Sequence, residues 1–230
     1  MSRVLVAGDL HHPFCHEDYL IFLKAIRRKY RTTETVFVGD ELDLAAISDY
    51  EHDPDGFAAG HELIEAINNL EPYYKAFPRV KICHSNHTAR ILKRAFKSGI
   101  PKACIKELRE ILNAPRGWEW KDHWEIDDVI YLHGIGYSGP LGALNAAMDK
   151  HKSCVIGHLH SDSGILYRSN GKETIYGMNV GCGIDAKAYA FNYGKDSRKK
   201  PILSCGVVID GKPYLEIMTL DKKGRWDWSL

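Results

Sequence analysis

The feature that most constrains this chain is a short apolar run, Thr35 to Val38, followed directly by the motif Gly39 to Asp43. An apolar run of this length that stops at a glycine is typical of a buried parallel strand. Asp40 therefore lies where the strand ends, and in open α/β sheets ligands bind outside the carboxyl ends of the strands. A single acidic residue at a strand end is common in loops, so its meaning depends on the other strand ends.

Four other apolar runs also end in polar residues: Val4 to Gly8, Val80 to Cys83, Val129 to Leu132 and Cys154 to Ile156. They are followed by Asp-Leu-His, His-Ser-Asn-His, His-Gly and Gly-His-Leu-His, respectively. Apolar residues at helical spacing predict a helix over Asp18 to Tyr30, between the first of these runs and the next strand. This order predicts a β-α-β unit with a right-handed crossover.

Polar side chains at these strand ends can converge on metal ions. Residues i and i+2 of an extended segment point to the same side, so Asp9 can act with His11 and His158 with His160. If these residues were unrelated buried polar groups, each would need its own hydrogen-bond partner. We therefore predict a metal site at one edge of the fold. The candidate ligands are Asp9, His11, Asp40, Asn86, His133, His158 and His160.

The mixture of carboxylate, amide and imidazole ligands indicates which ions the site binds. Such ligands suit transition metals better than Ca²⁺ or Mg²⁺. The candidate ligands suffice for two divalent ions, and two ions about 3.5–4 Å apart are a known arrangement for hydrolysing phosphate esters. We expect Mn²⁺ to support activity in vitro, with Fe, Zn and Ni as alternatives.

Length and composition place the chain among ordinary globular proteins. With 230 residues it can form one domain with a full core, and no run approaches the roughly 20 apolar residues of a membrane span. The N-terminal residues lead into a strand without a signal-peptide pattern, and the six Cys lack CxxC spacing. We therefore expect reduced thiols, a cytoplasmic location and no membrane partner. The net charge of +1 names no partner, and the oligomeric state stays open.

Two segments of this single domain are predicted to be helical insertions, at about residues 44–77 and 89–125. The first contains a helix over Ala58 to Leu70 in an acidic stretch, which indicates a solvated face. The second is basic, and a face of its helix could either hold a polyanion such as nucleic acid or simply be solvated. The tryptophans of the second insertion predict internal packing. The basic face consists of Arg90, Arg94 and Lys97.

Beyond the last His pair the pattern becomes rich in strands. Between Gly181 and Lys200 lies an irregular loop whose aromatic residues either approach the site or cover the sheet. These aromatic residues are Tyr189, Phe191 and Tyr193. The predicted strands are Ile165 to Arg168, Thr174 to Val180, Leu203 to Ile209 and Tyr214 to Thr219.

The strand-end motifs resemble those of the calcineurin-like metallophosphoesterase family. In order, that family shows Asp-x-His, Gly-Asp-x-x-Asp, Gly-Asn-His-Asp/Glu, a His before Gly, and Gly-His-x-His. The order is the same here. With a helix rich in Arg and Lys directly after Asn86-His87, the sequence is also similar to small bacterial and phage members. The sequence departs from the family at Ser85 and Thr88, where Gly and an acidic residue are usual. The motifs stand here at Asp9 to His11, Gly39 to Asp43, Ser85 to Thr88, His133-Gly134 and Gly157 to His160.

The resemblance implies a fold, a ligand set and catalytic residues. The fold would be α/β, a two-sheet metallophosphoesterase sandwich flanked by helices, with a helical insertion. His87 would be catalytic by assisting the leaving group, and Asp43 would orient it. Arg90 in the basic segment and His12 beside the first motif are candidates for binding substrate. One ion would be held by Asp9, His11, Asp40 and His160, and the other by Asp40, Asn86, His133 and His158.

The implied activity is hydrolysis of a phosphate ester by a hydroxide that bridges the two ions. The basic segment favours a phosphodiesterase that acts on a nucleotide or nucleic acid. A phosphomonoesterase, including a protein phosphatase, is the alternative within the same chemistry, although Leu44 stands where many protein phosphatases carry Arg. A non-catalytic scaffold with this fold is the alternative from another class. Scaffolds of that kind typically lose a ligand or the catalytic His, and none is missing from this sequence.

Overall fold

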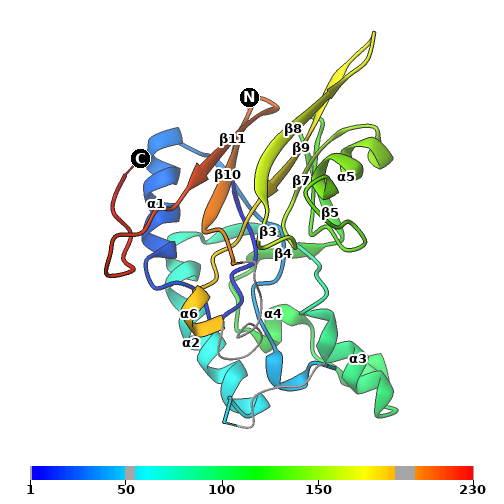
Figure 1. Cartoon of the computed structure of the whole chain (residues 1–230). Coiled ribbons are helices and arrows are strands. Elements are labelled where there is room, and N and C mark those ends of the chain that lie inside the picture. The colour runs from blue at the N-terminus through cyan, green and yellow to red at the C-terminus, as the bar shows by residue number, and fades with distance from the viewer. Residues whose placement is uncertain (1, 50–54, 190–199, 230) are drawn as a thin grey trace.

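The computed structural model of the chain describes residues 2–49, 55–189 and 200–229. Within this part of the chain the strands form two sheets that face each other (Figure 1). In spatial order, the first sheet consists of β11 (Lys212–Ile217), β10 (Ser204–Ile209), β1 (Arg3–Ala7), β2 (Glu34–Phe37), β3 (Arg79–Cys83) and β4 (Gly117–Lys121). The second consists of β5 (His123–Ile126), β6 (Val129–Leu132), β7 (Ser153–Ile156), β9 (Thr174–Val180) and β8 (Ser163–Ser169).

Parallel pairing aligns the carboxyl ends of the central strands. The strands β1 to β4 run parallel in the first sheet, and β6, β7 and β9 run parallel in the second. Parallel sheets are normally covered on both faces, which explains why these strands are almost continuously apolar. Along β1, Val4 and Val6 face the core between the sheets, whereas Leu5 and Ala7 face the core under the helices, and all four are buried.

Helices cover the outer faces of both sheets (Figure 1). The helices α1 (Tyr19–Tyr30) and α2 (Ala59–Ala76) pack on the first sheet, and α5 (Gly142–Lys150) packs on the second. The α5 helix lies so close that a Cβ atom on Gly177 would be 2.2 Å from the carbonyl of Ala143, so only glycine fits there. The shorter helices are η1 (Ala45–Ile47), α3 (Ala89–Lys97), η2 (Lys102–Cys104), α4 (Leu108–Ile111) and α6 (Ala186–Tyr189).

The predicted α/β sandwich of two sheets flanked by helices is confirmed, but the second insertion is only partly helical. After α4 the chain forms β4, which extends the first sheet, and β5, which extends the second. The indole nitrogen of Trp118 donates to the carbonyl of Phe77 (2.8 Å), and that of Trp124 donates to the carbonyl of Ile82 (2.9 Å). The tryptophans therefore pack inside the fold, as expected.

The acidic insertion differs from the predicted solvated face at one residue. Glu62, on α2, is 2% exposed, and its carboxylate accepts hydrogen bonds from the backbone amides of Ala45 and Ala46, each at 2.8 Å. A carboxylate at the amino end of a short helix satisfies donors that have no intrahelical partner. Glu62 thus fixes the segment after Asp43 against α2.

The remaining predictions concern the cysteines, membrane spans and the aromatic loop. All six Cys are free thiols, and four of them are buried. Among the described residues, no helix combines the length and the apolar character that crossing a membrane requires. Phe191 and Tyr193 lie outside the described residues.

Candidate metal centre

The candidate ligands follow the carboxyl ends of strands from both sheets. The parallel β1, β2 and β3 deliver their ligands from the first sheet, and β6 and β7 deliver theirs from the second. The buried cluster that these ligands form joins the two sheets at one edge. In chain order, β1 is followed by Asp9 and His11, β2 by Asp40, β3 by Asn86, β6 by His133, and β7 by His158 and His160.

The carboxylate of Asp40 lies at the centre of this cluster. Its Oδ2 atom is 3.3 Å from Nε2 of His133 and 3.5 Å from Nε2 of His11. It is also 3.8 Å from Nε2 of His87. Asp40 belongs to every group of possible ligands, as expected of a residue shared by two ions. In each group the ligand atoms lie within 4.8 Å of one another: Asp9, Asp40 and His160; Asp40, His133 and His158; and His11, Asp40 and His87.

The burial of the carboxylates fits the binding of divalent cations. Asp9, Asp40 and Asp43 are all 0% exposed. Oδ1 of Asp9 and Oδ2 of Asp40 are buried without a hydrogen-bond partner among the described residues. Buried carboxylate oxygens that accept no hydrogen bond are costly, and coordination of a metal ion compensates them more fully than the nearby imidazole of His133. The donor set of carboxylate, amide and imidazole is one that transition metals accept.

Four of the candidate ligands have an unusual backbone conformation. Asp9, His11, Asp40 and His158 have φ angles of 44°, 49°, 51° and 68°, in the left-handed region that L-residues rarely adopt. Each such residue costs about 1–3 kcal/mol, and conformations of this kind cluster at functional sites. The strain is consistent with side chains that are aimed at a common centre rather than placed for stability.

Glycines next to two ligands allow the close approach. Gly39 has a φ of 102°, and a Cβ atom there would lie 2.9 Å from Nδ1 of His133 and 2.8 Å from Cβ of Ser85. A Cβ atom on Gly157 would lie 2.7 Å from Oδ1 of Asp9. The glycines of the Gly-Asp and Gly-His motifs are thus required because a larger residue would push the ligand-bearing segments apart.

Hydrogen bonds to the backbone and between side chains orient the ligands of the second group. Nδ1 of His133 donates to the carbonyl of Val38 at 2.8 Å, which leaves Nε2 facing the cluster. That Nε2 atom is 2.8 Å from Oδ1 of Asn86. The carbonyl of Val38 is the kind of outer contact that fixes the direction of a ligating imidazole, whereas Nε2 of His133 and Oδ1 of Asn86 are candidate ligand atoms for the same ion. The sequence could not reveal the carbonyl of Val38, because every residue carries one.

Burial and neighbouring charges shift the pKa values of the cluster. Burial raises the pKa of Asp9 to about 7 and lowers the pKa values of His158 and His160. Burial also works against protonation of His133, but the carboxylate of Asp40 outweighs it and raises the pKa of His133 to about 9. The metal-free cluster therefore retains protons near neutral pH. Divalent ions would displace these protons, so the affinity for metal rises with pH.

Asp43 does not contact His87 in the way that the resemblance implies. Its carboxylate Oδ1 is 2.6 Å from Nδ1 of His11, but 3.4 Å from Nδ1 of His87, which is too far for a strong hydrogen bond. Nδ1 of His87 instead donates to the backbone carbonyl of Asp43 at 2.5 Å. Burial lowers the pKa of His87 to about 4, so the metal-free ring is neutral with its proton on Nδ1. The carboxylate of Asp43 thus orients a candidate metal ligand, and its carbonyl orients the candidate catalytic residue.

Replacement of Asp43 separates these two roles. We expect Asp43→Asn to weaken Mn²⁺ binding by about 10–100-fold, the usual effect of losing a partner behind a ligating histidine. The bond from His87 to the carbonyl of residue 43 stays, because it involves the backbone. Isothermal titration calorimetry of Mn²⁺ binding, compared with turnover at saturating Mn²⁺, measures both effects. A variant with unchanged affinity but reduced turnover would instead assign the carboxylate to His87.

Arg90 lies beside His87, on the first turn of α3. Its guanidinium donates to the carbonyls of Asp43 (2.7 Å) and Leu44 (3.3 Å), and Nη2 is 3.2 Å from Nε2 of His87. Because Nδ1 of His87 carries the proton, Nε2 accepts the hydrogen bond from Arg90. The structure therefore places this candidate for substrate binding next to the candidate catalytic residue.

His12 points away from the cluster, so the structure does not support it as a substrate-binding residue. It is 4% exposed, and its ring packs against the ring of Tyr73 with a centroid separation of 5.0 Å. The segment is not extended here, because His11 has a φ of 49°, so the orientation of His12 follows from this turn and from its packing on Tyr73. His11 faces the cluster, and His12 consequently faces the core.

The basic face of α3 makes contacts within the fold that the sequence did not indicate. Arg94 donates to the carbonyls of Ile47 and Ser48, and it forms an ion pair with Asp49 at 3.2 Å. Lys97 pairs with the same carboxylate at 2.7 Å. These cations hold the segment after η1 against α3. Because the side chains of Arg94 and Lys97 stay 41% and 60% exposed, contact with a polyanion and simple solvation both remain predictions for this face.

Comparison with solved structures supports the fold. The chain is similar to Vps29 of Chaetomium thermophilum, with 13% identity, a TM-score of 0.51, and coverage of 98% of this chain and 92% of that one. It is also similar to the E. coli phosphoesterase Yfce (14% identity, TM-score 0.40, coverage 90% and 88%). The nuclease MPE of Pseudomonas putida gives 12% identity, a TM-score of 0.39, and coverage of 92% and 86%. No protein-family model and no curated protein sequence matches the chain. The chain shares its fold with Vps29.

Proposed function

We propose that this chain is a phosphoesterase that depends on two divalent transition-metal ions, and that it hydrolyses phosphodiester bonds of a nucleotide or nucleic acid. The observation that carries the proposal is the buried cluster in which Asp40 is shared by every group of ligand atoms. The resemblance of the motifs to calcineurin-like metallophosphoesterases supports it. One ion would be held by Asp9, His11, Asp40 and His160, and the other by Asp40, Asn86, His133 and His158.

The chemistry divides between the ions and the side chains. When bound, two such ions make a water-derived nucleophile available near neutral pH and neutralise charge on the phosphate oxygens. Asp9 and Asp40 supply the buried negative charge that holds them. His133 is fixed for the same task by the hydrogen bond from its Nδ1 atom to the carbonyl of Val38.

His87 and Arg90 would act on the substrate. Arg90 would bind a phosphate oxygen through its guanidinium, which already lies beside His87. His87 would donate a proton from Nε2 to the leaving oxygen while the carbonyl of Asp43 holds its Nδ1 proton. This donation needs a second proton on the ring, and the negative charge of a phosphate nearby favours that state.

The choice of a diester of a nucleotide or nucleic acid rests on the basic segment around α3. Although Arg94 and Lys97 are paired with Asp49, the side chains of Lys93, Lys106 and Arg109 are exposed and form no ion pair among the described residues. Exposed cations next to a phosphate site favour substrates with further phosphates. The competing substrate class is a phosphate monoester. The cytoplasmic location indicated by the unpaired thiols is part of this proposal.

The decisive test is hydrolysis of bis(p-nitrophenyl) phosphate and p-nitrophenyl phosphate, side by side, with Mn²⁺, Ni²⁺, Zn²⁺ or Mg²⁺. We expect the diester to be the better substrate with Mn²⁺, and an Asp40→Ala sample to be inactive on both. If the monoester were the better substrate, the chain would be a phosphomonoesterase rather than a phosphodiesterase. If metal bound but neither ester reacted, the chain would be a scaffold rather than an enzyme.

A further inference from the structure

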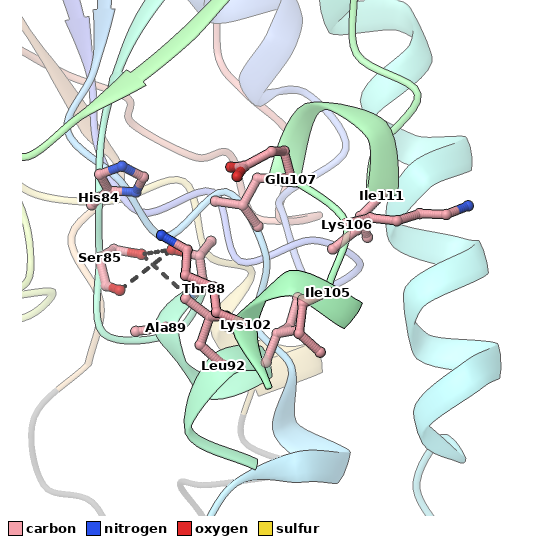
Figure 2. Close-up of a pocket in the computed structure, with 12 residues that line it drawn as sticks. His84, Ser85, Thr88, Ala89, Leu92, Lys102, Ile105, Lys106, Glu107 and Ile111 are labelled. Carbon is pink, nitrogen blue, oxygen red and sulfur yellow. Dashed lines mark hydrogen bonds between the residues drawn. The ribbon is translucent and has the colours of Figure 1, made fainter. Parts of the chain in front are cut away.

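A cavity lies next to the turn that carries Asn86 and His87 (Figure 2). Its volume is about 300 Å³, at the lower end of the range of small-molecule pockets. It lies between α3 and the segment from η2 to α4, and none of the candidate metal ligands lines it. Most of the wall is aliphatic. The apolar lining consists of Ala89, Ile91, Leu92, Ile105, Leu108 and Ile111.

One end of this cavity carries donors for an anion. Figure 2 shows the side chain of Lys102 extending toward Ser85 and Thr88, whereas Lys106 extends away from the cavity. The hydroxyls of Ser85 and Thr88 are 3.0 Å apart, and these residues are only 2% and 4% exposed. Lys102 forms no ion pair with any described residue, in contrast to Lys97. Because the hydroxyls of Ser85 and Thr88 hydrogen-bond to each other, at most one hydroxyl proton is available beside the ammonium group. An ammonium group with a neighbouring hydroxyl suits a carboxylate, sulfonate or phosphate.

The surrounding charge favours an anion as well. The lining includes one acidic side chain, Glu107, against Lys102 and Lys106. Lys93 and Arg109, on the neighbouring helices, are exposed and add positive charge. An ion with an apolar body would gain both from this field and from burial against the aliphatic wall.

We propose that this cavity is a binding site for a small amphipathic anion, distinct from the phosphate-ester site. The anionic head group would lie against Lys102 and the hydroxyls of Ser85 and Thr88, and the apolar body would lie against Leu92 and Ile105. Because Ser85 and Thr88 flank Asn86 and His87, the occupant contacts the turn that carries both residues. The proposal does not depend on catalysis.

Binding is tested on the full chain without metal, by isothermal titration calorimetry with naphthalene-2-sulfonate, which has no phosphate ester to hydrolyse. We expect saturable binding of one molecule per chain. Lys102→Ala should weaken it about tenfold, as expected for loss of a charge-assisted hydrogen bond in a partly enclosed site. The matched control is Lys93→Ala, which removes an equal charge from α3 outside the cavity and should change the affinity less than about twofold.

A second comparison separates the head group from the apolar body. The neutral analogue 2-naphthalenemethanol should bind about tenfold more weakly than the sulfonate, and Ile105→Ala should weaken both. Absence of saturable binding would overturn the proposal. Equal losses in Lys102→Ala and Lys93→Ala, or equal affinity for the alcohol and the sulfonate, would overturn it too.

Discussion

His87→Ala is expected to lose about 10²–10⁴-fold in turnover of a phosphate diester while still binding metal. The range is the usual contribution of a general acid or base, and His87 Nε2 lies 3.8 Å from the central carboxylate of Asp40. The candidate ligand sets do not need this ring, so two ions should remain. The measurement pairs steady-state kinetics on bis(p-nitrophenyl) phosphate with metal analysis of the purified variant.

The matched control for this variant is His61→Ala, because the side chain of His61 is 61% exposed on α2 and belongs to no group of candidate ligands among the described residues. It should leave turnover unchanged. The ring of His87 also contacts the ring of His11 at a centroid distance of 4.5 Å, so melting temperatures of both variants must accompany the kinetics. If His87→Ala turned over substrate like the wild type, His87 would have no part in the mechanism. If His87→Ala lost its metal, His87 would be a metal ligand, together with His11 and Asp40.

Asp40→Asn is expected to lose both ions and, with them, all measurable turnover. Asp40 belongs to every ligand group, and its Oδ2 atom is buried without a hydrogen-bond partner among the described residues. Changes to residues behind a ligand typically cost 10–100-fold in affinity, so removing a shared charged ligand should cost more than about 100-fold for each ion. The amide keeps the shape and can still accept the hydrogen bond from the backbone amide of His87.

The loss of metal in Asp40→Asn can be measured in two ways. Elemental analysis should show two ions per wild-type chain after loading with Mn²⁺ and less than one in Asp40→Asn. The melting temperature of the wild type should rise with Mn²⁺, since a ligand at about 100 times its Kd adds about 2.7 kcal/mol of stability, and that of the variant should not. Asp49→Asn is the control, because Asp49 is an exposed acidic residue that pairs with Lys97. Two ions retained in Asp40→Asn would contradict the shared role.

The sequence was sufficient for the parts of the fold that local pattern dictates. Strands such as Val129–Leu132 are short apolar runs bounded by glycine or polar residues, and the helix Tyr19–Tyr30 shows helical spacing. The polar residues at the strand ends could be grouped because parallel strands present their carboxyl ends together. The strand Gly117–Lys121 was missed because its tryptophans occupy a short stretch that could equally belong to a packed insertion.

Long-range partners were the part that the sequence could not supply. Arg94 and Lys97 look like an open basic face until the fold brings Asp49 against them. The carboxylate of Asp43 reaches His11 rather than His87, a choice between two histidines that spacing does not decide. The orientation of His12 was likewise not available from the sequence, because the backbone turns through left-handed conformations at Asp9 and His11.

The division of the candidate ligands between the two sheets has a consequence for how the molecule unfolds. Asp40 belongs to the first sheet and His133 to the second, and the layers meet mainly through apolar packing, with a few hydrogen bonds such as that from Trp124 to the carbonyl of Ile82. Ions held between the two sheets would act as cross-links. They would join segments that lie between residue 9 and residue 160 of the chain. Chelation would then reduce the cooperativity of the whole sandwich, because each layer could begin to melt without the other.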